Sequence, residues 1–161
     1  MTTDAPLWNW MQTYTGKKFL PMAPRIEDID IADIAHALSM LCRYGGHCND
    51  FYSVAEHSVL CSYAVDPEFA FDALMHDASE AYLVDMPRPI KAQLPGYREA
   101  EARLEEAIAA KYGLKYPMPP EVKAVDNAIL FDERKALLST PPEKWANEQE
   151  PLGIKINCWP H

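Results

Sequence analysis

The sequence lacks the basic excess that a general DNA- or RNA-binding protein would carry. Lysine and arginine together number 15, against 24 aspartates and glutamates, which gives a formal charge of −9 and a pI near 4.9. Surfaces that bind nucleic acid are normally basic, so we expect no nucleic-acid partner. A small anionic substrate stays compatible with this charge, because a metal ion and a few local cations can reverse the field inside a pocket.

The sequence also lacks a long apolar run, a secretory signal and a disulfide pattern. No apolar stretch approaches the length of a membrane span, and the first residues contain neither a basic nor an apolar region. The four cysteines form no Cys-x-x-Cys pair, and a chain of 161 residues does not need disulfides for stability. These absences predict free thiols, no membrane partner and a cytoplasmic location.

Strand signals are sparse, whereas apolar residues recur at helical spacing along most of the chain. We therefore predict one all-α domain over residues 1–161, a compact bundle of about five main helices. The expected helices cover about 31–43, 53–65, 66–83, 97–112 and 121–138. Residues 1–28 are rich in aromatic residues and predict an irregular arm with a short hairpin around Gly16, and residues 139–161 predict an irregular tail.

Short signals predict where several of these helices begin and end. Ser53 and Glu56 have the spacing of a capping box, in which each side chain binds the backbone N–H of the other residue. Asp30 and Asp66 are expected N-caps of the first and third helices. The prolines within residues 85–91 are expected to end the third helix in a rigid turn.

The third predicted helix contains the adjacent pair His76-Asp77, followed by Glu80. Imidazole nitrogen and carboxylate oxygen suit a divalent metal of the Zn, Mn, Co or Fe type better than Ca²⁺. On a continuous helix Glu80 would share a face with His76 and could reach a metal-bound water. The structural alternative for Glu80 is an ion pair with Arg88 or Lys91.

A catalytic metal site needs about three or four protein ligands and one open position. His57 lies just after a predicted N-cap, and Asp126 adjoins the apolar stripe of the last helix, where an unpaired carboxylate would be costly. Both are therefore candidate ligands, with Asp132 as the rival of Asp126. Helices packed in a bundle can direct such groups to one point in the core.

Four motifs in this order resemble those of the HD-domain phosphohydrolases, in particular the nucleotide-hydrolysing branch that includes the 5′-deoxynucleotidases. The motifs are Ser53-Val54-Ala55-Glu56-His57-Ser58, His76-Asp77-Ala78-Ser79-Glu80, Asp85-Met86-Pro87-Arg88-Pro89-Ile90-Lys91 and Val125-Asp126. The resemblance covers residues 43–126, about half of the chain. It implies an HD-domain bundle around one divalent transition metal (Zn, Mn or Co), with ligands His57, His76, Asp77 and Asp126.

The same resemblance implies roles for five further residues. Glu80 matches the glutamate that orients or deprotonates the attacking water, and Asp85 matches a residue that lies close to the deoxyribose and disfavours a 2′-hydroxyl. Arg43 would hold phosphate with its planar guanidinium group, and Lys91 would be a second phosphate cation. Tyr44 stands where the family has a tryptophan, so we expect different packing on the sugar or base.

The function implied by the resemblance is cleavage of the bond between O5′ and the α-phosphorus of a 2′-deoxynucleotide. The arm and residues 45–52 are closer to small phage-type triphosphohydrolases that act on dATP and release triphosphate, which would add a Mg²⁺ ion with the substrate. The alternatives are a 5′-deoxynucleotidase that releases phosphate from dNMPs, or a non-catalytic nucleotide-binding protein. A dimetal site would need further His or Asp ligands between His76-Asp77 and Asp126, and because residues 78–160 contain no histidine, a single metal site is favoured. The resemblance also implies a homo-oligomer in a bacterial cell or a phage-infected host.

Overall fold

A computed structural model describes residues 9–146 and 148–160, and this part of the chain is mostly helical, as predicted. Its only sheet is a small hairpin near the N-terminus, in which β1 (Met11–Gln12) pairs antiparallel with β2 (Lys18–Phe19). Gly16, with φ of 84°, lies in the connecting turn, which confirms the expected hairpin. The first eight residues of the predicted arm lie outside the described residues.

The helical elements follow one another along the chain with short connections. They are η1 (Ile26–Asp28), α1 (Ile31–Met40), η2 (Arg43–Gly46), α2 (Val54–Ala64), η3 (Pro67–Phe69), α3 (Ala70–Met75), α4 (Glu80–Leu83), α5 (Arg88–Lys91), α6 (Tyr97–Tyr112) and α7 (Pro120–Leu137). None of the helices within residues 9–146 and 148–160 combines the length and the apolar character that a membrane span requires.

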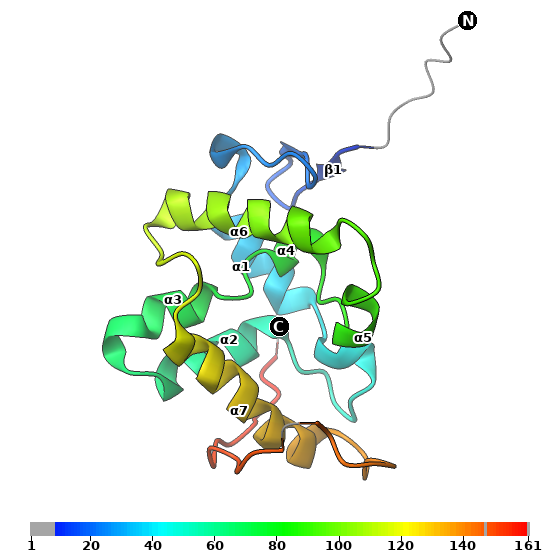
Figure 1. Ribbon diagram of the computed structural model, residues 1–161. Helices are drawn as coiled ribbons and strands as arrows, with labels where there is room; N and C mark the ends of the chain where they lie inside the picture. Colours follow the sequence, from blue (N-terminus) through cyan, green and yellow to red (C-terminus); the bar gives the residue numbers. More distant parts are fainter. Residues whose placement is uncertain (1–8, 147, 161) are drawn as a thin grey trace, which may run out of the picture.

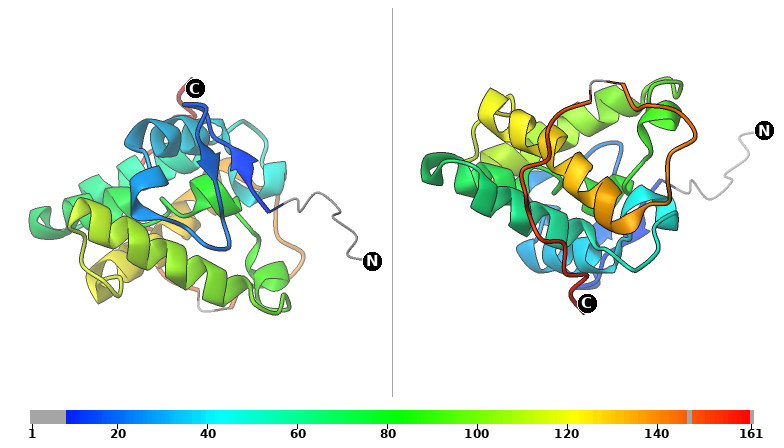
Figure 2. Two further views of the ribbon diagram at one scale, coloured as in Figure 1. Left: turned by 90° about the horizontal axis from the view of Figure 1, so that it is seen from above. Right: turned by 90° about the horizontal axis from the view of Figure 1, so that it is seen from below.

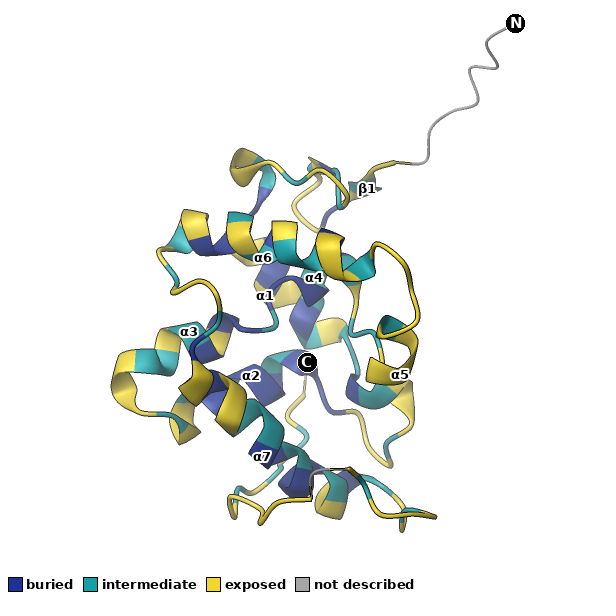
Figure 3. Cartoon of the chain, in the orientation of Figure 1, coloured by how far each residue is buried: buried dark blue, intermediate teal, exposed yellow. Residues whose placement is uncertain are grey.

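Helix α2 lies in the middle of the bundle, between α6 and α7, and contacts α1, α3 and α7 (Figure 1). Val54 belongs to one apolar cluster, with residues of β2, α1, α4 and α6. Leu60 and Cys61 belong to a second cluster, with residues of α3, α7 and the tail. Most of α2 is therefore buried (Figure 3), and a polar side chain in its middle is shielded from water.

The predicted capping box at the start of α2 is only half formed. Ser53 Oγ accepts from the backbone N–H of Glu56 at 3.0 Å, as expected. The Glu56 carboxylate instead accepts from the backbone N–H groups of Asn157, Cys158 and Trp159, at 3.1, 3.0 and 2.7 Å. Glu56 is 2% exposed and ties the irregular tail to α2, along the side of the bundle seen from below in Figure 2.

The third helix was predicted to run unbroken over 66–83, and this prediction is wrong. The chain forms η3, α3 and α4 there, with residues 76–79 between α3 and α4 in tight turns. The N–H of Ala78 bonds to the carbonyl of Met75 at 3.0 Å, and that of Glu80 to the carbonyl of Asp77 at 2.9 Å. Residues three apart eclipse one another in such turns, so Glu80 aligns with Asp77 rather than with His76.

In the first half of the chain, the predicted helix ends agree with the structure only in part. Asp30 caps α1 by accepting from a backbone N–H, but the expected side-chain cap at Asp66 is not made. Helix α1 ends at Met40 rather than near Arg43, because the chain then pairs with the segment before α2; the N–H of Arg43 donates to the carbonyl of Tyr52 at 2.9 Å.

The two long helices α6 and α7 match their predicted ranges closely, and α6 ends at Gly113 in the left-handed conformation. The expected turn over residues 85–91 contains the short helix α5, which begins after Pro87. The described part of the tail after α7 has no helix or strand, as expected.

Glu56→Gln is expected to lower the free energy of unfolding by about 1–2 kcal/mol, because the amide keeps one acceptor oxygen and leaves a partly buried N–H of the tail without a partner. Urea denaturation measures the change. Glu99→Gln, on the exposed face of α6, is the matched control and should change stability by less than about 0.5 kcal/mol. Equal stability of the two variants would show that the tail is not held in this way.

Candidate metal centre

Two imidazole rings meet in the interior, one from α2 and one from the turn after α3. The Nε2 atoms of His57 and His76 lie 3.3 Å apart. The other ring nitrogens are oriented by fixed acceptors: Nδ1 of His57 lies 2.6 Å from Glu133 Oε1, and Nδ1 of His76 lies 2.7 Å from the carbonyl oxygen of Ala73. Donation from Nδ1 leaves the Nε2 lone pairs directed at a common point, as in metal-binding histidines.

Two carboxylates complete the group around this point. Asp77 Oδ2 lies 3.6 Å from Nε2 of His57 and 3.2 Å from Nε2 of His76. Asp126 Oδ1, from α7, lies 3.3 Å and 3.7 Å from the same two atoms. Ligand atoms on one four-coordinate transition metal are about 3.3 Å apart. The structure thus brings all four predicted ligands together at distances that fit a shared ion.

The rival carboxylate, Asp132, lies on a different side of α7. Its two oxygens accept from the backbone N–H groups of Leu152 and Ile154, at 2.7 and 2.8 Å. Asp132 therefore holds the tail, and the choice of Asp126 agrees with the geometry.

A fifth potential ligand was not predicted from the sequence. Cys61 follows His57 by one helical turn, is fully buried, and places Sγ 3.7 Å from His57 Nε2. The ligand atoms of His57, Cys61 and His76 all lie within 4.8 Å of one another, so this group can hold a metal ion. The spacing of four residues after a histidine is the signal that could have identified the cysteine.

The centre attracts positive charge. Burial and the nearby guanidinium oppose an imidazolium, yet the surrounding carboxylates raise the pKa of His57 and His76 well above the usual value. Burial likewise opposes ionisation of Asp77 and Asp126, but the imidazoles beside them lower the pKa of both carboxyls, that of Asp77 to about 2. Protons and a divalent cation therefore compete for the same buried site.

Glu133 connects this centre to its surroundings and was missed in the sequence. It is fully buried on α7, two turns after a predicted ligand, and that spacing is the signal that could have found it. Besides His57 Nδ1 it accepts from the hydroxyls of Tyr52 at 2.9 Å and Tyr44 at 2.5 Å, and it pairs with Arg43 Nη2 at 3.2 Å. Burial opposes its ionisation, but the cationic groups around it lower its pKa to about 2.

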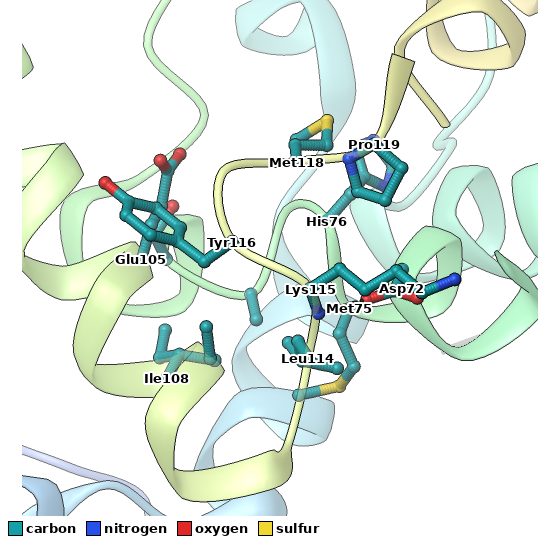
Figure 4. Close-up of a pocket in the computed structure, with 13 residues that line it drawn as sticks. Asp72, Met75, His76, Glu105, Ile108, Leu114, Lys115, Tyr116, Met118 and Pro119 are labelled. Carbon is teal, nitrogen blue, oxygen red and sulfur yellow. Dashed lines mark hydrogen bonds between the residues drawn. The ribbon is translucent and has the colours of Figure 1, made fainter. Parts of the chain in front are cut away.

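A cleft of about 950 Å³ opens on the centre and is large enough for a nucleotide. Of the four predicted ligands, all but His57 line it. The other predicted site residues line it too: Arg43, Tyr44, Glu80, Asp85 and Lys91. A second, smaller hollow of about 40 Å³ lies beside His76, is lined in part by Lys115, Met118 and Pro119, and is too small for a substrate (Figure 4).

The predicted phosphate cations are already partly neutralised. Arg43 is buried, and its Nη1 lies 3.6 Å from Asp77 Oδ2 in addition to the pair with Glu133. Lys91 Nζ pairs with Glu101 at 2.5 Å. Arg43 is therefore directed at the centre, whereas Lys91 would have to share its charge between substrate and glutamate.

Glu80 lines the cleft, and no cationic side chain among the described residues pairs with it. Its Oε2 is buried and has no hydrogen-bond partner within the part of the chain that the structure describes. Burial, with a smaller effect of the acidic neighbours Asp77 and Asp85, raises the pKa of Glu80 to about 9. Lys91 pairs with Glu101, and Arg88 donates a hydrogen bond to Asn127. The alternative ion pair of Glu80 with Arg88 or Lys91 is therefore not formed.

Comparison with known proteins places this site in a family without a stated activity. No family model matches the chain. An Escherichia coli K12 protein described as "Uncharacterized protein YfdR" is 47% identical over 129 residues, which cover 80% of this chain and 72% of that protein. The chain belongs to the YfdR family. An uncharacterized protein of Rhodobacter capsulatus is 36% identical over 124 residues, 71% of this chain and 63% of that protein.

The description of neither relative names a substrate or a reaction. The chemistry of the centre must therefore be argued from its residues.

Glu133→Gln is expected to weaken binding of Zn²⁺ or Co²⁺ by about 10–100-fold, because the amide no longer provides a carboxylate that orients and polarises His57. Isothermal titration calorimetry of the metal-free protein measures the change. Glu121→Gln, on an exposed position of α7, is the control and should bind metal as the wild type does. Unchanged affinity of Glu133→Gln would mean that the Glu133 carboxylate does not support metal binding through His57.

Metal affinity is expected to rise with pH until the protons on His57 and His76 are gone. Because the pKa values of both imidazoles are raised, the metal-free site retains protons above the usual histidine range, and the ion must displace them. Titration in buffers of different ionisation enthalpy should show proton release on binding. Affinity that is independent of pH across the neutral range would contradict this competition.

Proposed function

We propose that the chain is a metal-dependent phosphohydrolase that cleaves the O5′–phosphorus ester of a 2′-deoxynucleotide and releases the deoxynucleoside. The observation that supports this most is the convergence of His57, His76, Asp77 and Asp126 on one point beside a nucleotide-sized cleft, which the last three of them line. A buried set of two imidazoles and two carboxylates fits a transition metal such as Zn, Mn or Co. The resemblance to HD-domain enzymes supports the same assignment.

The residues around the centre fit roles in phosphate-ester hydrolysis. A divalent metal bound there would lower the pKa of a water molecule toward neutrality and polarise a phosphoryl oxygen. Arg43 is directed at the same point and can stabilise negative charge on the phosphoryl group. Glu80 has a free, buried oxygen with a high proton affinity and can accept the proton of the attacking water.

The high pKa of Glu80 is compatible with a base only when the centre is loaded. The negative charge of Asp77 is, after burial, the largest cause of the raised value. A cation held by Asp77 would offset that charge and favour the ionised form of Glu80. Asp85, whose own pKa is raised by burial, lines the cleft near Glu80 and fits the proposed contact with the deoxyribose.

The charge of the cleft supports the monophosphate more than the triphosphate as substrate. Acidic side chains outnumber cationic ones in its lining: Asp77, Glu80, Asp85, Glu101, Glu105 and Asp126, against Arg43, Arg88, Lys91 and Lys123. A triphosphate carries more negative charge and needs more unpaired cations, or an additional Mg²⁺. We therefore propose a 5′-deoxynucleotidase first and a dATP-type triphosphohydrolase second.

The deciding experiment is product analysis with the four dNMPs and the four dNTPs, each with Mn²⁺, Co²⁺ or Zn²⁺. Release of phosphate from dNMPs supports the nucleotidase, and release of triphosphate from dNTPs supports the triphosphohydrolase. If the protein binds nucleotides but releases neither product, the result supports a non-catalytic nucleotide-binding protein. Ribonucleotides serve as the matched control, since the proposed role of Asp85 requires slower turnover of substrates with a 2′-hydroxyl.

Two variants separate metal binding from proton transfer. Asp77→Asn is expected to lose the metal and all turnover, whereas Glu80→Gln should retain one metal per chain and lose about 10²–10⁴-fold in kcat. Metal content is measured by elemental analysis and kcat by phosphate release. Glu121→Gln is again the control. Full activity of Glu80→Gln would remove Glu80 from the mechanism.

A further inference from the structure

We propose that Cys61 binds the metal as a thiolate and is a fifth protein ligand beside two imidazoles and two carboxylates. The distance from its Sγ to Nε2 of His57 is 3.7 Å. A sulfur and a nitrogen bound to one ion, at about 2.3 and 2.1 Å, lie between about 3.1 Å apart at a ligand angle of 90° and about 3.8 Å apart at 120°. The observed separation fits coordination, whereas a thiol hydrogen bond of this length is weak.

The surroundings of Cys61 direct it at the two imidazole ligands. Within the described residues, the one hydrogen-bonding contact of its Sγ is His57 Nε2, and the second imidazole, His76, lies within the same 4.8 Å group. A further atom points to a bound cation independently: Asp77 Oδ2 is buried, within 3.6 Å of both imidazole Nε2 atoms, and has no hydrogen-bond partner among the described residues.

The cysteine lies on the side of the centre away from the cleft. His76, Asp77 and Asp126 line the cleft, whereas His57 and Cys61 do not, and both are fully buried. A sulfur ligand from this side leaves the cleft side of the ion open for water and a phosphoryl oxygen. Five protein ligands are therefore compatible with catalysis, because the exchangeable position faces the substrate.

A thiolate ligand changes which metal the site prefers. Sulfur is a soft donor and favours Zn²⁺ and Co²⁺ over Mn²⁺ and Mg²⁺, which prefer oxygen. On binding, the S–H bond breaks, its proton goes to solvent, and a metal–sulfur bond forms without any change of oxidation state. The inference rests on the metal centre of the proposed function and is independent of the substrate.

The test is absorption spectroscopy of the full chain loaded with one Co²⁺. A thiolate ligand produces a near-ultraviolet sulfur-to-cobalt charge-transfer band, while the visible ligand-field bands report bound cobalt as such. We expect the charge-transfer band in the wild type and its loss in Cys61→Ser, with the ligand-field bands retained. Cys158→Ser, which removes a thiol outside the centre, is the matched control and should keep the band.

Absence of the charge-transfer band from the cobalt-loaded wild type, its persistence in Cys61→Ser, or failure of the wild type to bind cobalt would each overturn the proposal. X-ray absorption of the zinc-loaded wild type gives a second measurement that does not depend on the folding of a variant. It should show one sulfur at about 2.3 Å, and a shell of nitrogen and oxygen alone would overturn it. A sulfur ligand in a protein that releases no product would instead refute the hydrolase and leave the coordination intact.

Discussion

The hydrogen bond between His57 and Glu133 is the interaction on which the centre depends. A fully buried carboxylate is costly unless its oxygens are satisfied, and Glu133 is satisfied by an imidazole, two phenols and a guanidinium. These donors come from α2, from η2 and from the segment before α2, so a single side chain of α7 sets the relative positions of all three. The same bond directs His57 Nε2 at the point where the other ligand atoms meet.

The interrupted helix at residues 76–79 has a comparable role on the opposite side of the centre. His76 Nε2 and Asp77 Oδ2 lie 3.2 Å from each other at the centre, and the tight turns align Glu80 with Asp77 at the wall of the cleft. The predicted helix over residues 66–83 is thus interrupted at the point where the chain supplies two neighbouring candidate ligands.

Sequence patterns predicted well those elements whose stability is local. The periodicity and end signals of α6 and α7 gave nearly their observed ranges, and Ser53 caps α2 as its spacing indicates. The same reasoning failed where a distant segment competes for the same group. Glu56 has the spacing of a capping residue, but three N–H groups from the tail, about a hundred residues later, take its carboxylate. A local sequence pattern cannot reveal this competition, because the competing groups lie far away in the sequence.

By itself the sequence determined a mostly helical chain and the residue types of a candidate metal site, because helical periodicity and the pairing of imidazole with carboxylate are local and chemical properties. Only the tertiary structure decided which groups meet. It placed Asp126 at the centre and Asp132 under the tail, although both lie on one helix, and it added Glu133 and Cys61. The physical reason is that ligand geometry depends on how α2, α7 and the 76–79 turn pack, and packing joins residues that are far apart in the chain.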